Sequence, residues 1–256
     1  MSDPVLEVAA NSVASALAVE AGGAARVELC SALEVGGLTP SHSAIAITCE
    51  RLRIPVHVLI RPRAGDFVFD DLECEVMRRD IETCKALGCA GVVLGMLTPE
   101  GDVDVPRCRV LIDAARGMSV TFHRAFDFAR DPERALETIM ALGCGRLLTS
   151  GQAADAMAGA PLIRKLIEQA RDRITIMPGG GITAQNIAAI AGATGAREFH
   201  ASAKQRITTR MDHPPPTLGE MEDVHWQTDA AEVHVRVDAL RTLSSSAHPS
   251  RRNPSQ

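Results

Sequence analysis

"ALGCAG" at residues 86–91 and "ALGCGR" at residues 141–146 are near copies, and each joins the end of a helical pattern to the start of a short apolar run. A glycine directly after a helical pattern is a common way for a helix to end. The repetition indicates that one strand–helix unit recurs along the chain, and eight such units can be counted. The predicted strands cover residues 5–9, 26–30, 55–60, 91–95, 119–123, 146–149, 174–177 and 198–201, and helical patterns between them include residues 70–87, 131–142, 161–171 and 184–193.

Eight strand–helix units within about 200 residues predict an α/β protein of the (β/α)₈ TIM-barrel class. The barrel forms a single domain over residues 1–243, closed by a helix over residues 230–243. The alternative, an open doubly wound sheet, would place a glycine fingerprint after the first strand, where this chain has "EVAANSVAS" at residues 7–15. Residues 244–256, "SSSAHPSRRNPSQ", predict a disordered C-terminal tail.

Composition narrows the function. The chain has 256 residues, of which 46% are hydrophobic and 23% charged, with a net charge of −5. The acidic balance and the scarcity of aromatic residues argue against a nucleic-acid partner. The sequence has no long apolar run for a membrane and no apolar signal core at its start, so we expect a cytoplasmic protein. Seven cysteines without a CxxC pair predict reduced thiols. We also expect a homo-oligomer.

Strand periodicity predicts which side chains enter the barrel. Because side chains alternate along a strand, the aliphatic parity should face the helices and the other parity the interior. The predicted inward residues are Glu7, Ala9, Glu28, Cys30, His57, Arg61, Thr121, His123, His200 and Ser202. Buried charges without partners are costly, so these groups should pair with one another or with a ligand.

Ionisable groups concentrate where strands end. "TFHRAFD" at residues 121–127 follows a predicted strand, and barrel active sites lie at the C-terminal ends of strands. Carboxylates and histidines there act as acids or bases if burial moves their pKa values toward neutrality, and arginines clamp anions. The predicted catalytic residues are Glu7, Glu28, Arg61, His123, Arg124, Asp127 and His200.

Glycine clusters after the seventh predicted strand, in "MPGGGIT" at residues 177–183. Successive backbone N–H groups before a helix attract anions, and barrels commonly bind phosphate in the loops after strands 7 and 8. The predicted phosphate or anion site consists of Ser150, Gly151, Gly179, Gly180, Gly181 and Ser202.

Five segments together resemble the CutC family: "RVELCSALEVGGLTPS" (26–41), "IPVHVLIRPRAGDFVF" (54–69), "VTFHRAFD" (120–127), "LLTSGQ" (147–152) and "MPGGGIT…EFHASA" (177–203). The resemblance implies a (β/α)₈ barrel with a role in cytoplasmic copper homeostasis and copper(I) as a ligand. Cys30 occupies the position of the family's strand 2 cysteine. The partner cysteine proposed in animal relatives is replaced by Ala9.

Three hypotheses therefore stand. The first is a copper-handling protein that uses Cys30 as a metal ligand. The second is an enzyme with lyase-type or isomerase-type acid–base chemistry on a small phosphorylated or carboxylated metabolite. The third is a barrel that binds a ligand without catalysis. In each case the expected partner is a small anion or a copper ion.

Overall fold

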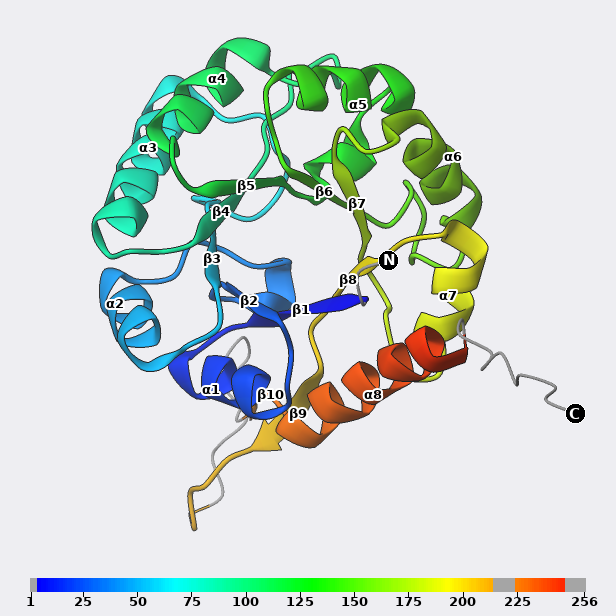
Figure 1. The fold of residues 1–256 in the computed structure, drawn as a ribbon. Helices are drawn as coiled ribbons and strands as arrows, with labels where there is room; N and C mark the ends of the chain where they lie inside the picture. The colour runs from blue at the N-terminus through cyan, green and yellow to red at the C-terminus, as the bar shows by residue number, and fades with distance from the viewer. Residues whose placement is uncertain (1–3, 214–223, 247–256) are drawn as a thin grey trace, which may run out of the picture.

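Eight parallel strands form a barrel that a ring of helices surrounds (Figure 1). This computed structural model describes residues 4–213 and 224–246. The strands are hydrogen-bonded in the order β7, β6, β5, β4, β3, β2, β1, β8. A parallel bridge between Gly179 and His200 joins the two outer members of this order. The predicted (β/α)₈ barrel is confirmed.

The barrel strands are β1 (Val5–Ala10), β2 (Arg26–Leu29), β3 (Val56–Leu59), β4 (Gly91–Leu94), β5 (Ser119–Phe122), β6 (Arg146–Thr149), β7 (Thr175–Pro178) and β8 (Glu198–Ala201). Every strand boundary lies within one residue of its predicted position. The α-helices are α1 (Val13–Ala21), α2 (His42–Arg51), α3 (Asp71–Ala86), α4 (Val105–Ala114), α5 (Pro132–Ala141), α6 (Ala160–Ala170), α7 (Ile187–Thr194) and α8 (Ala230–Ser246). Two 3₁₀ helices, η1 (Leu33–Val35) and η2 (Arg124–Phe128), follow β2 and β5.

Local sequence explains where helices begin. At α3, the Asp70 side chain accepts from the N–H of Glu73 and the Glu73 side chain returns a bond to the N–H of Asp70, which satisfies two unpaired helix donors. At α5, Asp131 caps the N-terminus and Pro132 occupies the first turn.

A hairpin outside the barrel was not predicted. Strands β9 (Lys204–Thr208) and β10 (Val224–Thr228) pair antiparallel beside α1 and project from the barrel (Figure 1). The closing helix α8 reaches Ser246, three residues beyond its predicted end. Residues 247–256 of the predicted tail lie outside the described residues.

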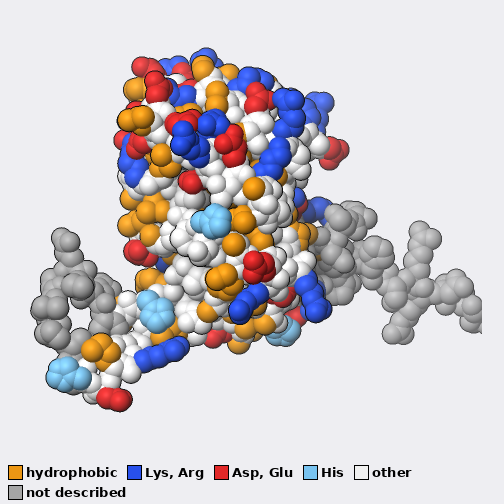
Figure 2. Space-filling view, turned by 90° about the vertical axis from the view of Figure 1, so that its left-hand side faces the viewer, with side chains coloured by type: hydrophobic (Ala, Val, Ile, Leu, Met, Phe, Trp, Pro, Cys, Tyr) orange, Lys and Arg blue, Asp and Glu red, His pale blue; other side chains and the backbone are white. Residues whose placement is uncertain are grey.

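The outer surface carries charges of both signs. Figure 2 views the side with α2 and α3, where acidic and basic side chains intersperse with small hydrophobic areas. On α3, Glu75 pairs with Arg78 at 2.8 Å and with Arg79 at 2.7 Å. None of the helices in the described ranges has the length and apolar character that a membrane span needs.

Gly91 of β4 and Gly95, which directly follows this strand, make room for histidines inside the barrel. Gly91 and Gly95 share the inward parity of their strand and its exit. A Cβ atom at Gly91 would lie 2.7 Å from the His57 ring, and one at Gly95 would lie 2.6 Å from Nδ1 of His123. His57 and His123 are both buried. The backbone of β4 therefore serves as a flat surface against which both imidazoles pack.

We predict that Gly95→Ala destabilises the fold by about 1–3 kcal/mol, because the new methyl group overpacks the site and displaces the His123 ring. Gly192→Ala is the matched control, since nothing lies within 4 Å of its added Cβ atom and alanine favours a helix. Urea unfolding of both variants measures the difference. Equal stability of Gly95→Ala and the wild-type protein would contradict the packing described above.

Candidate functional site

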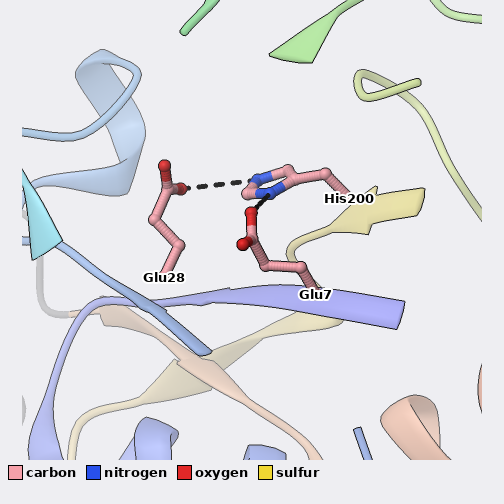
Figure 3. Close-up of side chains that lie close together, drawn as sticks. All are labelled: Glu7, Glu28 and His200. Carbon is pink, nitrogen blue, oxygen red and sulfur yellow. Dashed lines mark hydrogen bonds and ion pairs between the residues drawn. The ribbon is translucent and has the colours of Figure 1, made fainter. Parts of the chain in front are cut away.

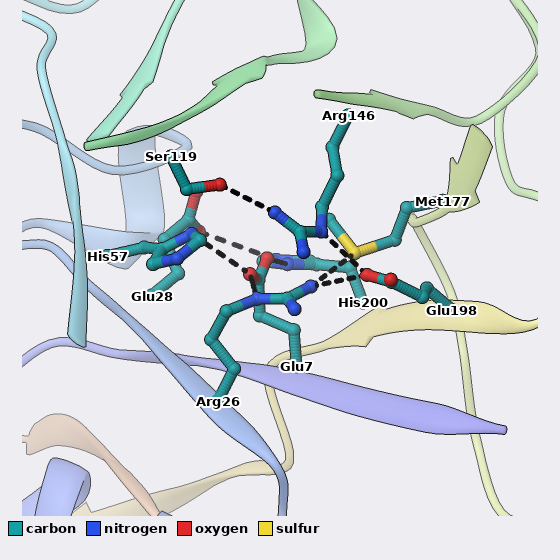
Figure 4. Close-up of polar contacts among 9 residues, drawn as sticks. All are labelled: Glu7, Arg26, Glu28, His57, Ser119, Arg146, Met177, Glu198 and His200. Atoms are coloured by element: carbon teal, nitrogen blue, oxygen red, sulfur yellow. Dashed lines mark hydrogen bonds and ion pairs between the residues drawn. The ribbon is translucent and has the colours of Figure 1, made fainter. Parts of the chain in front are cut away.

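A network of charged side chains fills the interior of the barrel near the N-terminal ends of the strands (Figure 4). Glu7, which is fully buried, forms an ion pair with Arg26 and a 2.8 Å hydrogen bond with Nδ1 of His200. Glu198 accepts from Nη2 of Arg26 at 2.8 Å and from Nε of Arg146 at 2.7 Å. The network supplies the internal pairing that the sequence requires.

Strand register brings these groups together. In the parallel ladders, Glu7 of β1 lies opposite Arg26 of β2 on one side and opposite His200 of β8 on the other. Sequence analysis named Glu7 and His200 but missed Arg26, Arg146 and Glu198. Each of the three is the first residue of its strand, and Arg26 shares the parity of Glu28, so the alternation rule extended by one step would have found it.

Glu7 stays ionised. Burial opposes the charge, but the hydrogen bond from His200 and the positive charge of Arg26 outweigh burial, so the pKa of Glu7 is lowered. His57 lies nearby, with Nδ1 3.8 Å from a Glu7 oxygen. Burial lowers the pKa of His57 to about 4, so its ring is neutral.

Above this network, His200 links Glu7 to Glu28 (Figure 3). Nε2 of His200 lies 3.5 Å from a carboxylate oxygen of Glu28. Burial raises the pKa of Glu28 to about 7, and the charge of Glu7 adds to this effect. For His200, burial disfavours the charged ring, but the carboxylates of Glu28 and Glu7 outweigh it and raise the pKa. The two groups can therefore exchange a proton near neutral pH.

A cavity of about 470 Å³ opens at the C-terminal ends of the strands. Glu28, Arg61 and His123 come from three different strands or strand exits and line this one cavity, as the sequence predicts. Other predicted site residues that line it are Cys30, Arg124, Gly180, Gly181, His200 and Ser202.

More cationic than acidic residues line the cavity, and two of the cations are paired outside the lining, Arg124 with Asp127 and Arg236 with Glu232. Four cationic residues line it (Arg61, Arg124, Lys204 and Arg236), whereas Glu28 is the one acidic residue among its lining residues. Sequence analysis missed Lys204 and Arg236 as site residues. Arg236 comes from α8, where its spacing looks like that of any surface arginine, so only the packing of α8 on the barrel reveals its position.

The glycine segment supplies open backbone donors. Gly180 and Gly181 adopt φ values of 99° and 70°, a left-handed conformation that suits glycine. Within the described residues, their N–H groups donate to no protein acceptor. Ser202 and Ala203 line the cavity from the next loop.

His123 and Arg61 form a rigid wall of the cavity. Nδ1 of His123 accepts from the N–H of Ala125 at 3.2 Å, which places the ring proton on Nε2. Burial, aided by the charge of Arg61, lowers the pKa of His123 to about 3, so the ring is neutral. The Phe67 ring lies between them, 5.0 Å from the His123 ring centroid and 4.9 Å from Cζ of Arg61. Arg61 also donates to the carbonyls of Val35, Gly37 and Gly65.

Five predicted site residues lie outside the cavity lining: Glu7, Asp127, Ser150, Gly151 and Gly179. Glu7 lies beneath it. The Asp127 carboxylate accepts from Thr149, from the N–H groups of Ser150 and Gln152, and from Arg124. Through these hydrogen bonds, Asp127 connects the loops after β5 and β6 and orients Arg124.

The metal ligands available differ from those expected. Cys30 packs against Leu59 and Val93, and burial raises the pKa of its thiol. Among the described residues, the one group of three or more His, Cys, Asp or Glu side chains within metal-ligand distance is Glu7, Glu28 and His200. It contains no thiol, and Glu7 is already held by Arg26. These oxygen and nitrogen donors do not suit Cu(I), which prefers sulfur.

The fold and the site define a (β/α)₈ barrel with a cationic cavity above a buried acid–base pair. The sequence model of the CutC family matches residues 4–205, and the chain belongs to this family. A Xanthomonas campestris pv. campestris (strain 8004) protein, "family protein CutC", is 54% identical over 237 residues, which cover 93% of this chain and 99% of the relative. A relative from Chromobacterium violaceum is 49% identical over 243 residues, covering 93% and 98%.

Solved structures agree. The crystal structure of CutC from Streptococcus agalactiae superposes with a TM-score of 0.75 at 35% identity and covers 78% of this chain and 98% of that one. Thiamine phosphate pyrophosphorylase from Pyrococcus furiosus matches with a TM-score of 0.58 at 16% identity, covering 93% and 96%, which shows the shared fold alone.

We predict that Glu28→Gln becomes more stable relative to the wild-type protein as pH rises from 5 to 8. Folding raises the pKa of Glu28 from 4.5 to about 7, so the folded wild-type protein binds more protons in this window and loses stability as pH increases. Glutamine removes this loss, which should be on the order of 2 kcal/mol. Denaturant unfolding across the pH range measures it. An exposed substitution, Glu168→Gln, is the control, and identical pH profiles for the two variants would refute the assignment.

Proposed function

We propose that this CutC-family protein binds a small phosphorylated or carboxylated metabolite in the cavity and catalyses a proton transfer to or from the bound metabolite. The observation that carries the proposal is the composition of the cavity wall: four cationic residues and the backbone of Gly180 and Gly181 surround a single acid–base pair, Glu28 and His200. A cavity of about 470 Å³ suits a small molecule.

Anion binding is supported by the donors on the β7 and β8 side. Gly180 lies beside Arg124, whose Nη1 would be 3.5 Å from a Cβ atom at Gly180. Arg236 donates to the Ile182 carbonyl of the same loop. A phosphate or carboxylate there would meet both backbone dipoles and guanidinium groups.

Proton transfer is supported by the arrangement of three side chains. The ionised Glu7 holds Nδ1 of His200, which orients the ring and directs Nε2 toward Glu28. Glu28, whose pKa is raised to about 7, is suited to accept a proton from a bound molecule and return it, with His200 beside it. Such a transfer is the central step of an isomerase-type or lyase-type reaction.

A copper role is the second candidate, because the name of the Streptococcus agalactiae relative links that protein to copper homeostasis. In this chain such a role would depend on Cys30, with Ala9 in place of a second thiol. One buried thiol is a poor Cu(I) site, so the geometry favours the metabolite. A Cu(I) competition titration that found one tight equivalent, lost in Cys30→Ser, would reverse this preference.

We further propose that the protein works in the cytoplasm. The seven cysteines are free, which suits a reducing compartment. Homo-oligomerisation stays a prediction.

We predict that inorganic phosphate, used as the probe, raises the melting temperature with the logarithmic concentration dependence of one-site binding and that Ser202→Glu shifts this dependence to higher phosphate concentration. A carboxylate at position 202, within the predicted anion site, would repel the anion. It should weaken anion binding at least tenfold, on the order of 1.4 kcal/mol. Ser43→Glu, on the exposed face of α2, changes the net charge equally and is the control. Differential scanning fluorimetry over a phosphate series, followed by carboxylated and phosphorylated metabolites, measures the shift.

The binding part of the proposal fails if no anion gives a shift that follows one-site binding, or if Ser43→Glu and Ser202→Glu respond alike. The catalytic part fails if the wild-type protein binds a metabolite but does not convert it, and if Glu28→Gln binds the same metabolite equally well. The protein would then be a barrel that binds a ligand without catalysis.

A further inference from the structure

A pair of thiols lies in contact at the end of the barrel opposite to the cavity. Sγ of Cys49, on α2, is 3.4 Å from Sγ of Cys89, which immediately precedes β4. The two residues are 40 positions apart in the sequence. The buried thiol of Cys84, on α3, also interacts with the Cys89 side chain. The proposed function uses none of these residues.

The three thiols differ in access. Cys84 is completely buried and Cys89 is 5% exposed, whereas Cys49 is only partly buried. A small reagent in solution would therefore meet Cys49 first. Cys89 contacts both Cys49 and Cys84.

A disulfide suits this position better than a metal ion. The trio does not meet the distance requirement for a three-ligand site, which Glu7, Glu28 and His200 alone satisfy among the described residues. Metal binding also requires thiolates, and these would lie near the C-terminal end of α3, the negative end of its dipole. The disulfide product is neutral, and its formation needs a thiolate only transiently, at Cys49.

We propose that Cys49 and Cys89 form a reversible disulfide when the protein meets a hydroperoxide. The Cys49 sulfur attacks the peroxide oxygen, which yields a sulfenic acid and releases an alcohol, or water if the oxidant is hydrogen peroxide. The Cys89 sulfur then attacks the sulfenic sulfur, the S–S bond forms and water leaves. Two thiols lose two electrons in total, and the O–O bond accepts them.

The bond would connect the end of α2 to the start of β4 and enclose β3 and α3. Strand β3 carries His57 and leads into Arg61, so the link spans the segment that supplies one cavity wall. Closing a loop of this length restricts the unfolded chain, and the melting temperature should rise by roughly 5–10 °C. The contact with Cys89 and burial raise the pKa of Cys49, so oxidation should accelerate as pH increases.

The experiment treats the full chain with hydrogen peroxide, alkylates the remaining thiols and maps tryptic peptides by mass spectrometry. Cys49 lies in peptide 27–51, Cys84 in 80–85 and Cys89 in 86–107. The expected product joins 27–51 to 86–107 with the loss of two hydrogens, and dithiothreitol reverses it. Because Cys30 shares peptide 27–51, the Cys30→Ser variant should still form this product.

Cys49→Ser should abolish the product and the increase in melting temperature, whereas Cys84→Ser, the matched control, should retain both. The proposal is overturned if oxidised wild-type protein carries Cys49 and Cys89 as separately alkylated or overoxidised residues, or if Cys89 pairs with Cys84 instead. Mapping of the wild-type chain gives this answer even if a variant fails to fold.

Discussion

The structure depends on the burial of one carboxylate. Glu7 is fully buried in the barrel, where an unpaired charge would cost several kcal/mol, so its partners must be supplied by the fold. Arg26 and His200 come from the strands on either side, and they reach Glu7 only when β1 lies between β2 and β8. The internal charges therefore constrain both closure and register, while aliphatic packing between sheet and helices supplies most of the stability.

The same charge connects the interior to the cavity. Glu7 holds one nitrogen of His200, and the other nitrogen faces Glu28 at the cavity floor. Without Glu7, only Glu28 would oppose the effect of burial on the charged imidazole, and the pKa of His200 would fall. The site thus has two parts. The buried network sets the protonation state of His200, and the cavity wall supplies cationic side chains and the unbonded amides of Gly180 and Gly181. This division explains why some ionisable residues at strand ends, such as Asp127, serve the scaffold.

The sequence predicts the barrel well because short apolar runs and helix-ending glycines repeat along the chain. It also predicts the convergence of Glu28, Arg61 and His123, because alternation and the common direction of parallel strands determine which side chains meet. It does not reveal Arg236 or the hairpin β9–β10, since these depend on how α8 and the segment after β8 pack on the barrel. The partners of Asp127 likewise follow from loop geometry that periodicity does not encode.

The most direct test is the pH titration of the His200 ring nitrogens by ¹⁵N NMR, in the wild-type protein and in Glu7→Gln. The account predicts that wild-type His200 remains protonated above its ordinary pKa of 6.5 and that the pKa falls when Glu7 loses its charge. A wild-type His200 that titrates below 6.5, or that does not respond to Glu7→Gln, would contradict the claim that Glu7, together with Glu28, raises the pKa of His200.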